Sequence, residues 1–362
     1  MPRHLPSLDG LRAIAVLLVL WQHVPLHTEG YPLWLEQARW LVNPGNLGVE
    51  LFFALSGFLI TRILLAEQRA GHQVRWFLLR RMLRIFPIYY LLLMVMAFWR
   101  PADELAWCAL YVSNFADVFA PAAGPKPLGH TWSLCVEEHF YLLWPLAVAF
   151  GGPEKARRLL TWFVIPVAVF GAVAVGVTLE QRAAEFAVER LSPFRFLTLA
   201  CGALLAFAEP RVCATATRPR DSGIVTTALA LALHPHVWFL LVPFFWLGAT
   251  SWPFGLAPAC WRADSALLCV GILTWTLTPR GVWLSPARAL SLQPLRALGR
   301  ISYGIYLYHL PIYHWMLWPA PSVKSAAAAI AVTFAVATVS YLVVERPILR
   351  FAARFRHRSA DR

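Results

Sequence analysis

The chain has 362 residues, of which 59% are hydrophobic and only 14% are charged, and its formal net charge is +13. Soluble domains are nearer half apolar and a quarter charged, so this composition excludes an ordinary soluble protein. The positive charge lies in short loops between apolar runs, which favours membrane lipid over nucleic acid as the partner.

Ten apolar runs predict an all-α integral membrane protein, a bundle of about ten transmembrane helices. The run 222–247 is counted as one helix interrupted at 234–236, because each half is too short to cross a core of about 30 Å. The stretch 105–132, after the third helix, is predicted to be a re-entrant or interfacial segment. The runs cover residues 11–26, 47–66, 85–99, 136–150, 160–179, 192–208, 222–247, 264–278, 301–318 and 324–344.

In this topology, arginine is much more frequent in the loops on one side of the membrane than on the other. The positive-inside rule therefore predicts that both termini are cytoplasmic. Residues 1–350 are expected to form the transmembrane domain and 351–362 a basic cytoplasmic tail. We expect the chain in the cytoplasmic membrane of a bacterium. The predicted inside loops are 67–84, 151–159, 209–221 and 279–300, together with the segment that follows Glu345.

The first helix carries Arg12 and His23 on nearly the same face, about 16 Å apart along the axis. Ionisable groups within spanning helices are costly and usually functional, and histidine suits general-base chemistry near neutral pH. The alternative is a snorkelling arginine and an interfacial histidine.

In the second helix, Glu50 and Ser56 are candidates to line a cavity. A face of small residues that packs closely, with Glu50 at the outer interface, explains that helix equally.

Two further motifs carry charge next to apolar sequence. Arg81 and Arg84, at the cytosolic start of the third helix, form a fork suited to phosphate, although positive-inside anchoring also accounts for them. Trp132, Glu137 and Glu138 lie just before the fourth helix, on the outer side. One carboxylate could hold His23 in its tautomer, and the alternative is a solvated interfacial pair.

The ninth helix carries a polar stripe that includes Tyr306 and His309. A lone buried histidine is more often a satisfied core group than a ligand, but the stripe favours His309 as a cavity-lining residue. The six cysteines have no metal-binding spacing, so no metal site is expected.

Together these segments resemble the acyltransferase type 3 family of membrane proteins, whose motifs recur here in the family's order. The family also has about ten helices and an inside N-terminus. The motifs that carry the resemblance are Leu8–Ala15 with His23, Gly48–Ile60, Arg80–Tyr90, Thr131–Tyr141, Ser302–Pro311 and Glu345–Pro347.

The resemblance implies transfer of an acyl group, often acetyl, from cytosolic acyl-CoA to a hydroxyl of a carbohydrate or a glycosylated small molecule. It maps the family's Arg–His pair onto Arg12 and His23, and its CoA-contacting arginines onto Arg81 and Arg84. His23 is then expected to be the catalytic base or nucleophile. Glu137, from the family's acidic pair, is the candidate that orients or protonates it.

Two alternatives stay open at this point. Within the enzyme class, the acceptor could be a macrolide or another small hydrophobic molecule. Outside it, buried His, Glu and Arg residues also build proton relays in multi-pass transporters. The absence of a two-fold hydropathy repeat weakens the transporter alternative. The sequence does not indicate an oligomeric state.

Overall fold

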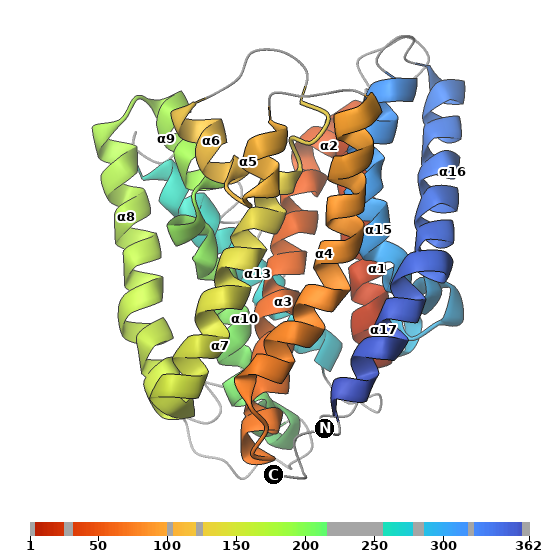
Figure 1. Ribbon diagram of the computed structural model, residues 1–362. Coiled ribbons are helices and arrows are strands. Elements are labelled where there is room, and N and C mark those ends of the chain that lie inside the picture. The colour runs from red at the N-terminus through yellow and green to blue at the C-terminus, as the bar shows by residue number, and fades with distance from the viewer. Residues whose placement is uncertain are drawn as a thin grey trace.

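The computed structural model is a helical bundle in which the long helices run up and down between two ends (Figure 1). It describes residues 4–24, 32–99, 104–120, 126–215, 256–277, 286–317 and 322–356. These residues form helices joined by turns, and no strand occurs among them. The interrupted helix predicted over 222–247 lies outside the described residues.

The described helices, in chain order, are long ones that cross the bundle and short ones at its ends. Their bounds are α1 Pro6–His23, α2 Leu33–Val42, α3 Pro44–Arg69, α4 Val74–Trp99, α5 Leu105–Ala109, α6 Ser113–Phe119, α7 Thr131–Leu159, α8 Ile165–Thr178, α9 Gln181–Arg190, α10 Ser192–Thr215, α13 Ala257–Leu277, α14 Ala287–Leu290, α15 Gln293–Met316, α16 Val323–Ser340 and α17 Arg346–Ala353. Wide π-helical turns, Leu160–Val164 and Tyr341–Glu345, join α7 to α8 and α16 to α17.

The predicted runs other than 222–247 coincide for most of their length with these helices and π-helical turns, and an all-α membrane fold fits the structure. By length and composition, five helical segments of the described part could cross a membrane: Leu33–Arg69, Val74–Trp99, Thr131–Thr178, Ser192–Glu209 and Val323–Ala353. Large apolar side chains of α4, α8 and the π-helical turn after α16 face outward, among them Phe98, Phe170 and Val343. Such surfaces suit lipid better than water.

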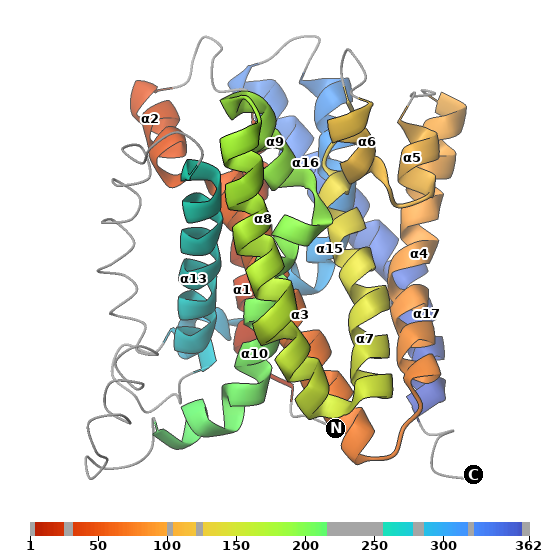
Figure 2. The same ribbon diagram turned by 90° about the vertical axis from the view of Figure 1, so that its left-hand side faces the viewer.

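Helices α3 and α10 touch backbone to backbone at the centre of the bundle. A Cβ on Gly57 would lie 1.9 Å from the carbonyl oxygen of Leu199, and one on Gly202 would lie 2.2 Å from that of Ala54. The small residues that the sequence places on one face of α3 therefore do permit close packing. Helix α1 packs on α3 and α15, and α13 packs on α10 and α8 (Figure 2).

The segment after α4 contains two short helices, α5 and α6, which lie at the same end of the bundle as α2 and α9 (Figure 1). Neither is long enough to cross a bilayer. The opposite end gathers the start of α1, the α3–α4 connection, the α7–α8 connection and the end of α17 (Figure 1). Arginines flank these connections: Arg69 and Arg75 lie on either side of the α3–α4 connection, and Arg157 and Arg158 precede the α7–α8 connection. We call this the arginine-rich end and the other the outer end.

Candidate active site

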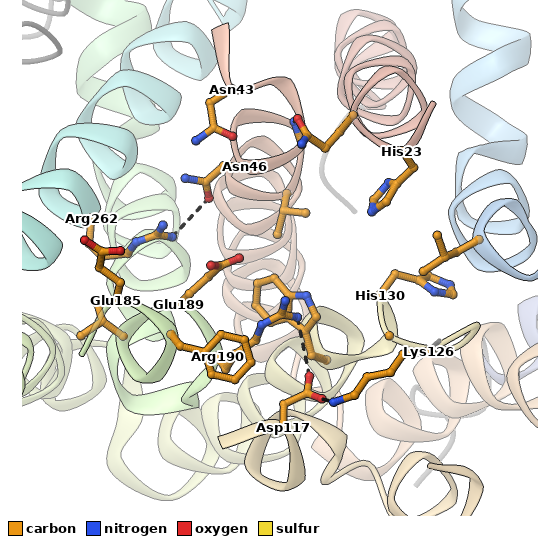
Figure 3. Close-up of a pocket in the computed structure, with 18 of the residues that line it drawn as sticks. His23, Asn43, Asn46, Asp117, Lys126, His130, Glu185, Glu189, Arg190 and Arg262 are labelled. Carbon is orange, nitrogen blue, oxygen red and sulfur yellow. Dashed lines mark hydrogen bonds and ion pairs between the residues drawn. The ribbon is translucent and has the colours of Figure 1, made fainter. Parts of the chain in front are cut away.

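A large cavity of about 810 Å³ opens at the outer end, and His23 points into it from the last turn of α1 (Figure 3). Its walls come from α1, α3, α6, α7, α9, α13, α15 and the turn before α7. Predicted residues that line it are His23, Trp132 and Tyr306. We call it the outer cavity.

The hydrogen bonds of His23 define which ring nitrogen is free. Nδ1 lies 2.9 Å from the carbonyl oxygen of Val19, one helical turn back, and 3.2 Å from Nε2 of His309. A carbonyl oxygen can only accept, so Nδ1 of His23 carries the hydrogen. Nε2 has no hydrogen-bond partner among the described residues. As an unprotonated imidazole nitrogen, it has the form required of a base or a nucleophile.

His309 is the group that contacts His23, and its own tautomer agrees with this assignment. Its Nδ1 lies 2.6 Å from the carbonyl oxygen of Tyr306, so Nδ1–H donates there and Nε2 is left to accept from His23. His309 is fully buried and, among the described residues, does not line either of the cavities described here. His309 therefore does not line either cavity, and it holds the His23 ring through the hydrogen bond between the two imidazoles.

A second, much narrower cavity of about 70 Å³ lies among α1, α3, α4, α7 and α15. We call it the inner cavity. It brings together seven residues that the sequence singles out: Arg12, Ser56, Arg81, Arg84, Glu137, Glu138 and Tyr306. Three guanidinium groups face two carboxylates there, so the cavity is lined by an excess of positive charge. This is a favourable lining for an anionic ligand.

The two arginines of the fork lie inside a helix and not at its start. Helix α4 begins at Val74, about two turns before Arg81. The guanidinium of Arg81 stacks 3.6 Å from the ring centre of Tyr141, and Arg84 is exposed. Their neighbour Arg80 instead forms an ion pair with Glu67 of α3. The chain therefore uses one arginine to join α3 to α4 and leaves the next two at the cavity.

Glu137 lies in the inner cavity, whereas His23 lines the outer one. The carboxylate of Glu137 accepts a hydrogen bond of 2.5 Å from Ser56 Oγ. The hydrogen-bond partners of the His23 ring are Val19 and His309, so the contacts do not support Glu137 as the residue that orients His23. Glu138 also lines the inner cavity.

Glu50 belongs to a separate buried ion cluster and does not line either cavity. Its carboxylate is 2.7 Å from the guanidinium groups of both Arg195 and Arg262 and accepts a hydrogen bond from Thr198. Glu50 is 1% exposed and the side chain of Arg195 is 0% exposed. The expectation of an interfacial Glu50 is therefore wrong, because the carboxylate is needed inside the bundle to neutralise two arginines.

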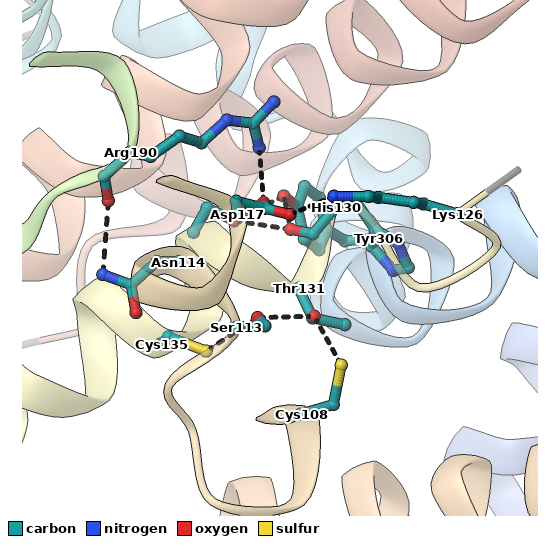
Figure 4. Close-up of polar contacts among 11 residues, drawn as sticks. Cys108, Ser113, Asn114, Asp117, Lys126, His130, Thr131, Cys135, Arg190 and Tyr306 are labelled. Carbon is teal, nitrogen blue, oxygen red and sulfur yellow. Dashed lines mark hydrogen bonds and ion pairs between the residues drawn. The ribbon is translucent and has the colours of Figure 1, made fainter. Parts of the chain in front are cut away.

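Charged residues at the rim of the outer cavity were not singled out from the sequence. Asp117 of α6 forms ion pairs with Lys126 at 2.7 Å and with Arg190 at 3.7 Å (Figures 3 and 4). The guanidinium of Arg190 lies 4.6 Å from the ring centre of Trp132. These residues sit in loops and short helices with no recognisable motif, so only the fold could bring them together.

Buried hydrogen bonds hold the short helices α5 and α6 against α7 (Figure 4). Thr131 Oγ1 lies 3.3 Å from Cys108 Sγ and 3.1 Å from Ser113 Oγ, and Ser113 Oγ lies 3.2 Å from Cys135 Sγ. These contacts fix the start of α7, and with it the position of His130. Within the described ranges, no group of three His, Cys, Asp or Glu side chains is arranged to hold a metal ion.

Residues 5–345 match the family described as acyltransferase domain. The chain is 30% identical over 374 residues to the peptidoglycan O-acetyltransferase OatA of Listeria monocytogenes, covering 96% of this chain and 56% of the relative. It is 30% identical over 377 residues to the O-acetyltransferase OatA of Staphylococcus aureus, covering 96% of this chain and 57% of the relative. A putative peptidoglycan O-acetyltransferase of Bacillus subtilis, YrhL, is 28% identical, with coverage of 96% and 55%.

The chain thus spans a little over half the length of these relatives. No solved structure matches it. The family match runs through α1, which carries Arg12 and His23, and reaches Glu345 at the end of the last π-helical turn. On this evidence the chain belongs to the acyltransferase family, as the motifs of its sequence predict.

Proposed function

We propose that this protein transfers an acetyl group from acetyl-CoA, supplied at the arginine-rich end, to a carbohydrate hydroxyl held in the outer cavity. The observation that carries the proposal is the position of Tyr306 and Val49, which line both cavities. A ligand that enters the inner cavity past the arginines therefore reaches Tyr306 and Val49, which also line the outer cavity that contains His23. The arginine-rich end would be cytoplasmic, in a bacterial cytoplasmic membrane, since positive loops stay inside.

The size of the inner cavity supports a slender ligand arm. Its volume of about 70 Å³ holds a few water-sized groups, far less than a nucleotide. The thioester arm of acyl-CoA fits such a passage, while its phosphates would stay at the mouth with Arg81 and Arg84. Arg12 would attract the donor further in. Glu137 would accept a hydrogen bond from an amide of the arm, in place of the role at His23 first expected for it.

The chemistry we propose uses the free nitrogen of His23. Nε2 removes the proton of the acceptor hydroxyl, and the resulting oxygen attacks the thioester carbon. As the C–O bond forms and the C–S bond breaks, the thiolate takes the proton back from His23. The Val19 carbonyl and His309 keep the imidazole in the tautomer that this step needs.

The outer cavity suits a sugar acceptor. Trp132 offers an aromatic face, and ion-paired polar groups such as Asp117 and Lys126 line the same space. The relatives whose names mention peptidoglycan make a hydroxyl of the peptidoglycan glycan our first acceptor to test.

The test is transfer of label from radiolabelled acetyl-CoA to soluble peptidoglycan fragments by the purified chain in detergent. We expect transfer by wild type and its loss in His23→Ala. His139→Ala is the matched control, since His139 bonds to Ser192 and lines neither cavity. Equal transfer by His23→Ala and wild type would refute the role of His23. Absence of transfer and of donor turnover in wild type would refute the proposed donor.

A further inference from the structure

Two hydroxyl groups converge on one backbone carbonyl at the wall between the two cavities. Tyr306 Oη donates to the carbonyl oxygen of His130 at 3.0 Å (Figure 4), and Ser133 Oγ donates to the same oxygen at 3.1 Å. The two hydroxyl oxygens are only 2.5 Å apart. Tyr306 lines both cavities, Ser133 the inner one, and His130 the outer one.

This cluster holds more donors than the carbonyl needs. The backbone N–H of Ser133 also points at the His130 oxygen, at 3.4 Å, so three donor groups lie within reach of one acceptor that has two lone pairs. The two hydroxyls have only two hydrogens for their three contacts, so one hydrogen lies between the hydroxyls while the other donates to His130. One hydroxyl hydrogen can therefore turn to a new oxygen while the carbonyl of His130 stays satisfied.

The surrounding contacts fix both hydroxyls in place before any ligand arrives. His130 Nε2 lies 3.0 Å from the carbonyl oxygen of Leu307, which ties α15 to the start of α7. His309 Nδ1 bonds to the carbonyl oxygen of Tyr306 itself. Tyr306 is 5% exposed and Ser133 is 3% exposed. Donors whose oxygen atoms are already in place stabilise developing charge well, because only a hydroxyl hydrogen has to rotate during the reaction.

We propose that Tyr306 Oη, assisted by Ser133 Oγ, forms the oxyanion hole of the acyl transfer. The inference rests on the proposed function. When the acceptor oxygen attacks the thioester carbon, the π electrons of the carbonyl move onto its oxygen, which becomes negative. Tyr306 Oη–H turns from Ser133 Oγ and donates to that oxygen, while Ser133 Oγ–H keeps donating to the carbonyl oxygen of His130. Collapse of this tetrahedral intermediate restores the C=O bond, expels the thiolate and frees the Tyr306 hydroxyl.

The position of His23 agrees with this assignment. The rings of His23 and Tyr306 both contact the ring of His309, with centroid distances of 4.9 Å and 5.6 Å. A carbonyl carbon that reaches the outer cavity past Tyr306 would thus have its oxygen near the hydroxyl and its open face toward the imidazole.

The test measures kcat and KM for acetyl-CoA and for soluble peptidoglycan fragments, in wild type, Tyr306→Phe and Ser133→Ala. We expect Tyr306→Phe to lower kcat by about 100-fold or more, the usual loss for one oxyanion donor. KM for acetyl-CoA should change by less than about threefold, because the hydroxyl acts on the transition state. The Ser133→Ala change should lower kcat less, and the double variant should fall short of the product of the single effects.

Tyr308→Phe is the matched control, because Tyr308 lies on the same helix, bonds to Ser340 at 2.8 Å and lines neither cavity. It should keep the wild-type kcat. If Tyr306→Phe unfolds, Ser133→Ala alone decides, and wild-type kcat in that variant would overturn the proposal. Wild-type kcat in folded Tyr306→Phe would overturn it while leaving the proposed function intact. A rise in KM for the acceptor alone would also overturn it, by placing the hydroxyl in acceptor binding. Absence of turnover in wild type would refute the proposed function first.

Discussion

Two regions of the bundle contain a glutamate among arginines, and they differ in how completely the charges are paired. Around Glu50, the carboxylate contacts two guanidinium groups and a hydroxyl, and Glu50, Arg195 and Thr198 are buried, while Arg262 also borders the outer cavity. Around Glu137, the carboxylate has Ser56 as its hydrogen-bond partner, and the nearby arginines line a cavity. The first arrangement has the features of a structural element and the second those of a binding site.

The comparison teaches that an ionisable residue in a spanning helix is not by itself evidence of function. Burying charges costs several kcal/mol, which is recovered only when each charge is paired and hydrogen-bonded. Glu50 meets that condition. Arg81 and Arg84 have no carboxylate partner within ion-pair distance among the described residues, so their charge remains available for a ligand. Mutations should separate the two regions by their effects on stability and on donor binding.

The largest effect is expected from Glu50→Gln. The change leaves Arg195 and Arg262 buried without a counter-charge, and loss of one partner from such a pair costs about 3–5 kcal/mol. Thermal unfolding in detergent, followed by the loss of helical circular dichroism, measures the effect. The double variant Glu50→Gln with Arg262→Gln should recover part of the stability. A Glu50→Gln protein as stable as wild type would show that the cluster is not structural.

The next effect is on donor affinity, from Arg81→Ala combined with Arg84→Ala. Loss of two charged hydrogen-bond donors should weaken binding of CoA by at least about 10- to 100-fold, since even one such contact is worth roughly 1.5–3 kcal/mol. Stability should change little, since Arg80 still joins α4 to Glu67. Isothermal titration with CoA measures this, with Arg75→Ala as the exposed control on the same helix. Unchanged affinity in the double variant would remove the arginines from the donor site.

The smallest effect is expected from Glu137→Gln, which matches the first substitution in size and chemistry. The amide oxygen can still accept from Ser56, and no buried guanidinium loses its only partner, so stability should change by less than about 1 kcal/mol. KM for acetyl-CoA should rise several-fold because a charged hydrogen bond becomes a neutral one. Parallel melts of the two Gln variants compare the regions directly. A loss at Glu137 as large as that at Glu50 would remove the distinction between them.

The sequence predicts an all-α membrane fold because lipid demands long apolar runs. It also predicts Arg12 and His23 on one helix face, since helical geometry relates residues that are close in the chain. It does not predict that Arg81 lies inside a helix. An apolar run ends at the first cluster of charges, whereas α4 continues through that cluster to Val74. Short amphipathic helices such as α2 and α9 contain no long apolar run, so a search for such runs misses them.

Contacts between distant segments are the part that the sequence could not provide. His23 and His309 are 286 residues apart, and their hydrogen bond depends on how α1 packs against α15. Without that packing, Glu137 was the nearest plausible partner for the imidazole. The pairing of Glu50 with Arg195 and Arg262 likewise needs α3, α10 and α13 to be in place. Helix periodicity identifies a face but not the residue on the neighbouring helix that meets it.

The most direct test of the central claim, that His23 performs chemistry on a donor bound elsewhere, is one experiment on wild type and His23→Ala. It measures acetyl transfer to soluble peptidoglycan fragments and, in the same samples, the rise in melting temperature caused by CoA. We predict that transfer falls by at least about 1,000-fold, as expected when a base essential to the reaction is removed. The rise caused by CoA should equal that of wild type. Transfer that persists in His23→Ala, or a CoA effect that disappears with it, would contradict the separation of donor site and catalytic base.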